Sequence, residues 1–222
     1  MRLWKLAAWG GVAGPVLFTA AWVVSSLRQA GYSPVEVQLS GLAADDAADP
    51  QIMMTVFVVL GVCSVAFGAA LARRVALRSP GRWLVMAGGV AAMAAGVFRR
   101  DHLLLTGPGF AGESWHNQVH DVASAVAYAA MLAAPLVLER HFRDDPHWAV
   151  LSRPVQGLAL ASAACLVVFA SRVAEPWNGA LQRAAVTLGL AIEVALAVRM
   201  LTPRAGSRGP AGSALASIQA GR

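Results

Sequence analysis

The chain has 222 residues, of which 57% are hydrophobic and only 14% are charged, and its mean hydropathy is +0.57. Because an average soluble domain carries about 25% charged residues, this composition excludes an ordinary water-soluble domain. The net charge of +6 follows from arginines in the connections between apolar segments, so we expect membrane lipids as partners and no nucleic acid.

Six apolar stretches, each near the length that crosses a bilayer, follow one another along the chain. Because an open strand edge cannot be satisfied in hydrocarbon, we predict an all-α, polytopic membrane helical bundle. The predicted spans are Ala7–Leu27, Gln51–Ala72, Trp83–Phe98, His116–Leu138, Pro154–Ser171 and Ala184–Leu201. They form a six-helix transmembrane domain over residues 1–201, and residues 202–222, rich in Gly, Ser and Arg, are expected to form a disordered cytoplasmic tail.

The first span follows basic residues, as the apolar part of a signal peptide does, but its apolar run continues to about Leu27. We expect a retained span, with cleavage after Ala20 or Ala21 as the alternative. The connection Arg28–Pro50 is the longest. In it Val35, Leu39 and Leu42 recur at helical spacing, which predicts a short helix lying on the surface.

The distribution of basic residues predicts the orientation of the bundle. With both termini in the cytoplasm, the inner segments hold 13 of the 18 lysines and arginines and the outer loops hold five, as the positive-inside rule favours. We therefore expect a multi-pass protein of the plasma membrane. Tryptophans near predicted span ends support these boundaries, since indoles prefer the headgroup level: Trp4, Trp9, Trp83, Trp115, Trp148 and Trp177.

A polar cluster is predicted at the outer ends of the third and fourth spans. His116 and His120 are four residues apart, so both imidazoles leave one face of a helix. With Asp101 they could hold a divalent metal ion and a water. Without metal, the same imidazoles beside Asp101 or Asp121 suit general acid and base chemistry. Further inward, Ser124 and Tyr128 continue this stripe at four-residue steps.

A structural interpretation of the same cluster stays open. Arg99, Arg100 and Asp101 would then anchor the end of the third span and pair with Glu113 or Asp121, because ionisable groups cost little at a membrane interface. Isolated histidines four residues apart are a weak metal signal without a third ligand nearby.

Glu193 lies deep in the sixth predicted span, ten residues after Arg183. A charge at such depth costs about 3 kcal/mol on insertion scales. It is therefore either a neutral carboxylic acid bonded to a hydroxyl of a neighbouring span, or a functional group.

Several short motifs resemble, in order and spacing, those of a bacterial and archaeal six-helix membrane family catalogued as domain of unknown function nine-nine-eight. They are Gly31-Tyr32-Ser33-Pro34, Gln38-Leu39-Ser40-Gly41-Leu42, Gly96-Val97-Phe98-x-x-Asp101, His116-x-x-x-His120-Asp121 and Gly179-x-x-Gln182-Arg183. The resemblance covers about Ala7 to Leu201 and departs at Arg99, where the family usually has proline. It implies the fold and topology, and no settled activity.

We expect an intramembrane acid/base enzyme acting on a lipid-like or isoprenoid substrate, for example in terpene cyclisation or lipid hydrolysis. The candidate catalytic residues are Asp101, His116, His120, Asp121 and Glu193. The candidate substrate-binding residues are Trp115, Ser124, Tyr128, Gln182 and Arg183. No cofactor is required by this chemistry, and the alternative is a divalent metal on His116, His120 and Asp101. The competing function is a non-enzymatic sensor, assembly partner or transporter accessory whose polar cluster is structural.

Overall fold

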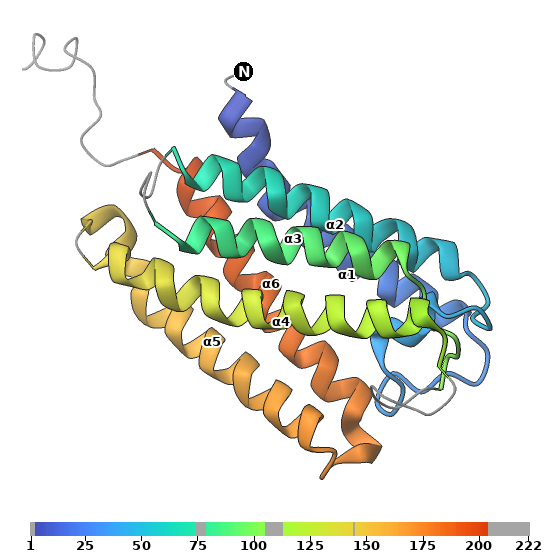
Figure 1. The fold of residues 1–222 in the computed structure, drawn as a ribbon. Helices are drawn as coiled ribbons and strands as arrows, with labels where there is room; N and C mark the ends of the chain where they lie inside the picture. Colours follow the sequence, from blue (N-terminus) through green and yellow to red (C-terminus); the bar gives the residue numbers. More distant parts are fainter. Residues whose placement is uncertain (1–2, 74–78, 105–112, 144, 204–222) are drawn as a thin grey trace, which may run out of the picture.

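The computed structural model of the chain describes residues 3–73, 79–104, 113–143 and 145–203. Within these residues it contains six α-helices, two short 3-10 helices and no strand (Figure 1). Nearly all of the predicted tail lies outside the described residues. The elements are α1 (Leu3–Arg28), η1 (Leu39–Ala43), α2 (Pro50–Leu71), α3 (Gly81–Val97), α4 (Trp115–Phe142), α5 (Pro146–Ser171), η2 (Glu175–Trp177) and α6 (Asn178–Leu201).

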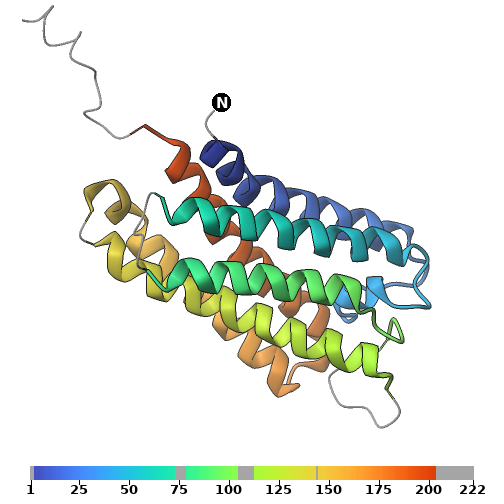
Figure 2. The same ribbon diagram turned by 45° about the horizontal axis from the view of Figure 1, so that its top comes forward.

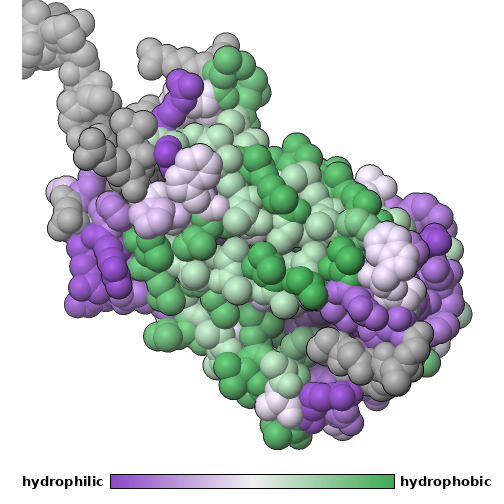
Figure 3. All heavy atoms as spheres, viewed as in Figure 1, coloured by the Kyte–Doolittle hydropathy of each residue, from purple (hydrophilic) through white to green (hydrophobic). Residues whose placement is uncertain are grey.

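The all-α membrane bundle predicted from the sequence is confirmed. Five helices, α1, α2, α4, α5 and α6, are long and apolar enough to cross a membrane. The sixth, α3, is apolar but has only 17 residues, about 25 Å of helix against a hydrocarbon core of about 30 Å. Apolar side chains cover the middle of the face seen in Figure 3 and hydrophilic ones gather at its two ends, as lipid contact requires.

The helices form a ring in which each one packs against the next and α6 closes on α1 (Figures 1 and 2). The connections 29–49, 98–104 and 172–177 lie together at one end of the bundle, which we call the loop-rich end. The packing of α4 against α5 is the sparsest around the ring. In Figure 1, α5 and α6 run away from α4 towards the loop-rich end.

Small residues bring α2 and α3 close together. A Cβ atom on Gly61 would lie 2.3 Å from the carbonyl oxygen of Gly89, and one on Gly96 would lie 2.7 Å from that of Met54. Backbones this close need glycine, which is the usual way that membrane helices gain packing contacts. The short α3 is thereby held firmly to the long α2.

The fifth helix begins eight residues before the predicted start of its span. Asp145 caps α5 by accepting a hydrogen bond from the His147 amide at 2.9 Å, and Pro146 occupies the first turn, where its fixed φ favours helix. Pro154, predicted as the first residue of the span, lies inside the helix. Proline is tolerated there because membrane helices compensate for the missing amide.

The predicted surface helix in the long connection is wrong in type and in place. Residues Leu39–Ala43 form the 3-10 helix η1, and all five are buried. Leu39 and Leu42 are three residues apart, which is one turn of a 3-10 helix, so both side chains enter the cluster around Phe18 and Met53. These five residues therefore fill the interior of the bundle at its loop-rich end.

Trp148 lies near a helix end, as predicted, but its indole faces the protein interior. It is buried, and its ring stacks on that of Phe142 with the centroids 5.5 Å apart. The extended start of α5 turns this indole into the core, whereas Trp83, Trp115 and Trp177 remain exposed near helix ends.

Arg183 of α6 fastens the long connection to the bundle. Its guanidinium donates to the carbonyl oxygens of Pro34 at 2.8 Å and Val37 at 2.9 Å, and to the hydroxyl of Tyr32. The same group lies over the rings of Trp22 and Tyr32. These contacts determine where the residues just before η1 lie.

Candidate functional site

A cleft of about 380 Å³ lies where α4 separates from α5 and α6, at the loop-rich end. This volume is within the usual range for small-molecule sites. Exposed Ala125 of α4 and Ala170 of α5 lie on its rim. The polar lining residues are Gln38, Ser40, Asp121, Ser124, Tyr128, Arg172, Asn178 and Gln182, and the apolar ones are Ala125, Leu132, Leu166, Phe169 and Ala170. The cleft therefore has the composition of a site for an amphiphile.

The polar wall is connected by hydrogen bonds. Gln182 donates through Nε2 to the Tyr128 hydroxyl at 2.9 Å and accepts through Oε1 from the Leu39 amide at 2.5 Å. Three of the residues predicted to bind substrate, Ser124, Tyr128 and Gln182, thus meet in one cleft. The same Gln182 side chain holds η1 against α6.

Asp121 is the predicted catalytic residue that lines this cleft. Its carboxylate accepts a hydrogen bond from Nδ2 of the fully buried Asn117 at 3.2 Å. Asn117 also accepts from the backbone amide of Asp101 at 3.2 Å and donates to Glu113 at 2.7 Å. The side chain of Asn117 thus connects the backbone that follows α3 to the carboxylate in the cleft. Asn117 therefore positions Asp121.

Arg100 lies behind the polar wall and is 1% exposed. It donates through Nη1 to Oε1 of Gln38 at 2.9 Å and to the Ser40 hydroxyl at 3.2 Å. Burial lowers the pKa of its guanidinium, and the nearby carboxyls of Asp121 and Glu113 partly oppose that shift. Arg100 is thus a buried cation whose charge interacts favourably with the cleft carboxylate.

Asp101 serves the junction between α3 and α4. Its two carboxylate oxygens accept from the Ser114 hydroxyl at 2.6 Å and the Ser114 amide at 2.7 Å. Desolvation raises the pKa of this carboxyl, but the two hydrogen bonds from Ser114 outweigh it, so the pKa lies below its usual value. Ser114 in turn caps α4 by accepting from the amide of Asn117 at 3.2 Å.

His120 faces α3 and is fully buried. Its Nδ1 lies 2.8 Å from the carbonyl oxygens of both Ala95 and Phe98. Since carbonyl oxygens only accept, Nδ1 carries a proton. Nε2 has no hydrogen-bond partner among the described residues, and the Phe57 ring covers the imidazole edge to face.

The other histidine lies nearer to the surface. The His116 ring stacks beside that of Trp115, with the centroids 3.8 Å apart, and it is close enough to Asp101 to lower the pKa of that carboxyl. In the part of the chain that the structure describes, no three metal-ligating side chains gather in one place. His116, His120 and Asp101 are therefore neighbours without forming a three-ligand set there.

The predicted polar stripe on α4 divides between two faces. Each residue of a helix turns by about 100°, so Ser124 lies about 40°, Tyr128 about 80° and Asp121 about 100° round the helix from His120. These three residues line the cleft, whereas His120 meets the carboxyl end of α3. The imidazoles and the cleft carboxylate are thus on different sides of one helix.

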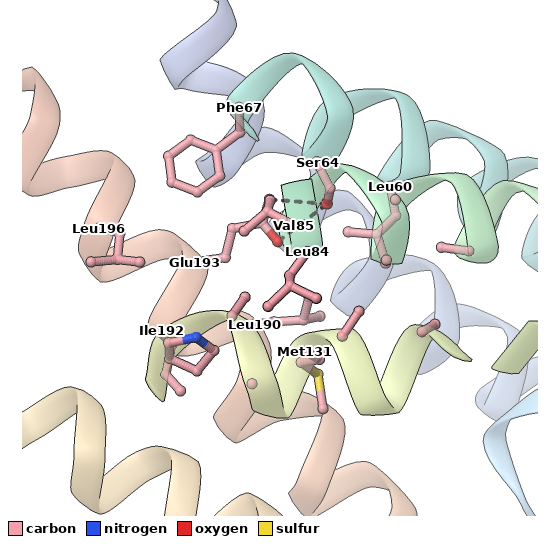
Figure 4. Close-up of a pocket in the computed structure, with 18 of the residues that line it drawn as sticks. Leu60, Ser64, Phe67, Leu84, Val85, Met131, Leu190, Ile192, Glu193 and Leu196 are labelled. Atoms are coloured by element: carbon pink, nitrogen blue, oxygen red, sulfur yellow. Dashed lines mark hydrogen bonds between the residues drawn. The ribbon is translucent and has the colours of Figure 1, made fainter. Parts of the chain in front are cut away.

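Glu193 lies in a separate cavity of about 110 Å³ between α2, α3, α4 and α6. The Ser64 hydroxyl lies 3.0 Å and 3.2 Å from its two carboxyl oxygens. Figure 4 shows both side chains among apolar neighbours that include Leu84 and Met131. The expected hydroxyl partner on a neighbouring helix is present, and Glu193 does not line the cleft that holds Asp121.

Two further predicted residues lie outside the cleft lining. Arg183 holds the long connection, as described above, and the exposed Trp115 packs against the Phe98 ring at 5.6 Å between centroids. The cleft instead includes Gln38 and Asn178, with Asn117 and Arg100 behind it, and none of these was predicted as a site residue. Two sequence signals could have indicated them: Gln38 begins one of the family motifs, and Arg100 lies three residues after an apolar helix.

Comparison with known proteins gives a family and no activity. A search of curated proteins and a search of solved structures found no match. The family model described as "Protein of unknown function (DUF998)" matches residues 12–199, a range that runs from α1 to the end of α6 and contains every residue of the cleft lining. The chain therefore belongs to the DUF998 family of proteins of unknown function.

Proposed function

We propose that this membrane protein binds a lipid-like or isoprenoid molecule in the cleft between α4, α5 and α6, and acts on it by acid/base catalysis. The observation that carries the proposal is the division of the lining. Its polar residues lie mainly on α4, on α6 and in and just before η1, and its apolar residues lie mainly on α5, which ends at the polar Arg172. An amphiphile would place its polar group near Asp121 and its chain against Leu166 and Phe169. Sparse packing of α4 against α5 lets such a chain enter from the lipid.

Asp121 is the group that we propose for proton transfer. It is a carboxylate in the cleft lining, held by Asn117 and balanced by the buried Arg100. A carboxylate in this position is within reach of the polar group of a bound ligand, which is the geometric requirement for general acid or base catalysis. Asp101, His116 and His120 would act through the junction of α3 and α4 that positions Asp121, and Glu193 would act from its own cavity.

The test uses the full chain in lipid nanodiscs, incubated with a bacterial lipid extract in D₂O and, separately, in H₂¹⁸O. A cyclase or isomerase incorporates deuterium into a lipid, and a hydrolase incorporates ¹⁸O. We expect a mass-shifted lipid with the wild type, and an at least tenfold smaller amount with Asp121→Asn. General acid/base catalysis contributes roughly 10²- to 10⁴-fold, so a tenfold threshold is conservative.

Binding is tested separately by filling the cleft. Ala125→Phe adds a ring at the rim, and Val122→Phe adds the same ring at a position of α4 that is 66% exposed and outside the cleft lining. Lipids that copurify with the wild type should be lost from Ala125→Phe and kept by Val122→Phe. Equal lipid retention in both variants would contradict the proposed site.

A non-enzymatic role is the second candidate, because many polar contacts at the loop-rich end connect protein segments to one another. Arg183 and Gln182 hold the long connection, and Asp101 holds the start of α4. A protein that binds lipid in the cleft but incorporates neither isotope would be a sensor, assembly partner or transporter accessory.

The proposed orientation places both termini in the cytoplasm of a plasma-membrane protein, with the loop-rich end outside. The support is the excess of basic residues in the segments at the opposite end. A reporter active only outside the membrane, fused to the C-terminus, should be inactive. An active fusion would reverse the orientation.

A further inference from the structure

Two buried amide side chains in the cleft lining each have a polar atom without a partner. Gln38 is 6% exposed and Asn178 is 2% exposed. Nε2 of Gln38 and Oδ1 of Asn178 have no hydrogen-bond partner among the described residues. Since a buried polar atom left unpaired costs free energy, this pair indicates a ligand that supplies both missing partners.

The orientation of the Gln38 amide follows from Arg100. A guanidinium has only donors, and Arg100 Nη1 lies 2.9 Å from the oxygen of Gln38. That oxygen must therefore face Arg100, which leaves the NH₂ group of Gln38 as the unpaired donor. In Asn178 the unpaired atom is the side-chain oxygen Oδ1, which is a hydrogen-bond acceptor.

The two amides lie on segments that touch. The amide of Gly179 donates to the carbonyl oxygen of Glu36 at 3.2 Å, and a Cβ atom on Gly179 would lie 2.4 Å from the oxygen of Val37. One turn further along α6, Gln182 binds the amide of Leu39. Gln38 and Asn178 thus flank one junction at the polar end of the cleft.

The charges near this junction disfavour an ionic head group. Asp121 lines the cleft itself, so a phosphate or carboxylate beside the two amides would meet like charge. Two nitrogens of the Arg100 guanidinium lack a partner among the described residues, but Arg100 is not part of the lining and lies among the carboxyls of Asp121, Glu113 and Asp101. The lining cation, Arg172, pairs with Glu175 at 3.2 Å. A cationic head group has only donors, and it would leave the donor of Gln38 unpaired. A neutral group that both donates and accepts satisfies the two amides.

We propose that the cleft binds the hydroxyl group of a long-chain or polyprenyl alcohol, which accepts from Nε2 of Gln38 and donates to Oδ1 of Asn178. The chain lies against Leu132, Leu166 and Phe169, which form the apolar lining. This inference rests on the proposed function, in which the cleft takes an amphiphile, and it specifies the head group. Asp121 then lies on the same polar wall as the alcohol oxygen, as an acid/base group requires.

The test compares four probes of equal chain length, each with a diazirine in the middle of a sixteen-carbon chain. Their head groups are a hydroxyl, a phosphate, an amine and a methyl group. The full chain in nanodiscs is irradiated with each probe, and labelled peptides are identified by mass spectrometry. We expect the alcohol to label α4 and α5 residues of the cleft most strongly.

Two variants test the two hydrogen bonds. Asn178→Leu removes the acceptor, and we expect alcohol labelling to fall roughly threefold to tenfold, the factor for one lost hydrogen bond. Gln38→Glu keeps an oxygen for Arg100 but replaces the donor by an acceptor, so labelling should shift from the alcohol to the amine probe. The control is Gln118→Leu, at an exposed position of α4 outside the cleft lining.

The outcomes separate the two proposals. Equal labelling by all four probes, or strongest labelling by the phosphate, would overturn the hydroxyl assignment and leave the cleft as a lipid site. Absence of cleft labelling by every probe, or labelling that Ala125→Phe does not reduce, would overturn both. If Asn178→Leu does not yield folded protein, the changed probe preference of Gln38→Glu decides the matter.

Discussion

The contribution of the junction between α3 and α4 to stability can be tested with one substitution, because the Ser114 hydroxyl makes two of the contacts there. Ser114 caps α4 by accepting from the amide of Asn117 at 3.2 Å, and it donates to the Asp101 carboxylate at 2.6 Å. Ser114→Ala removes both. Loss of an N-cap costs about 1 kcal/mol, and loss of a hydrogen bond to a partly exposed carboxylate adds about 0.5 to 1 kcal/mol after solvent screening.

The expected destabilisation is therefore about 2 kcal/mol, which lowers the Tm of a chain of this size by roughly 3 to 8 °C. The assay is thermal unfolding in detergent, followed by tryptophan fluorescence. Ser114→Thr is the matched control, since threonine keeps the hydroxyl and also caps helices, and it should unfold within about 2 °C of the wild type. If Ser114→Ala unfolds at the wild-type temperature, the junction does not depend on these contacts.

The pH dependence of the same variant tests the charge on Asp101. The pKa of this carboxyl is lower in the folded protein than its usual value, so its contribution to stability is complete above the usual carboxyl pKa. It is lost as the pH falls through the folded pKa. The Tm difference between wild type and Ser114→Ala should therefore be larger at pH 7 than at pH 3. A difference that grows on acidification would refute an ionised Asp101.

Three further substitutions test other contacts by the same unfolding measurement. Gly179→Ala should destabilise the protein by at least 2 kcal/mol or prevent its folding, because the new Cβ would lie 2.4 Å from the oxygen of Val37; wild-type stability would show that this packing is loose. Arg183→Lys should lower the Tm by roughly 4 °C or more, because an ammonium cannot reproduce the forked contacts of the guanidinium, and an unchanged Tm would contradict that role. Glu193→Gln should leave the Tm unchanged or raise it. The amide oxygen of the new glutamine still accepts from Ser64, and no charge can remain in the apolar cavity. A fall in Tm of more than about 4 °C would indicate that a charge on Glu193 is required.

Asp101 illustrates why a polar cluster in sequence does not specify its own role. The prediction brought Asp101, His116 and His120 together as a catalytic or metal-binding group, and the structure places all three at the junction of α3 and α4. Ser114 and Asn117, which form that junction with them, were not among the predicted site residues. Whether the predicted residues take part in catalysis stays a prediction that the isotope experiment tests.

The sequence alone determined that the chain is an all-α membrane bundle and where most of its helices run, because hydropathy and helix length are properties of consecutive residues. It also determined the family, whose motifs lie in order along the chain. Only the tertiary structure decided that Asp121 meets Gln38 and Asn178 in a cleft, away from His120. That result depends on the docking of η1 under Gln182 and on the divergence of α5 from α4. Both arise from packing between segments that are distant in sequence. This packing sets how far each helix is rotated about its axis, and no local sequence pattern encodes that rotation.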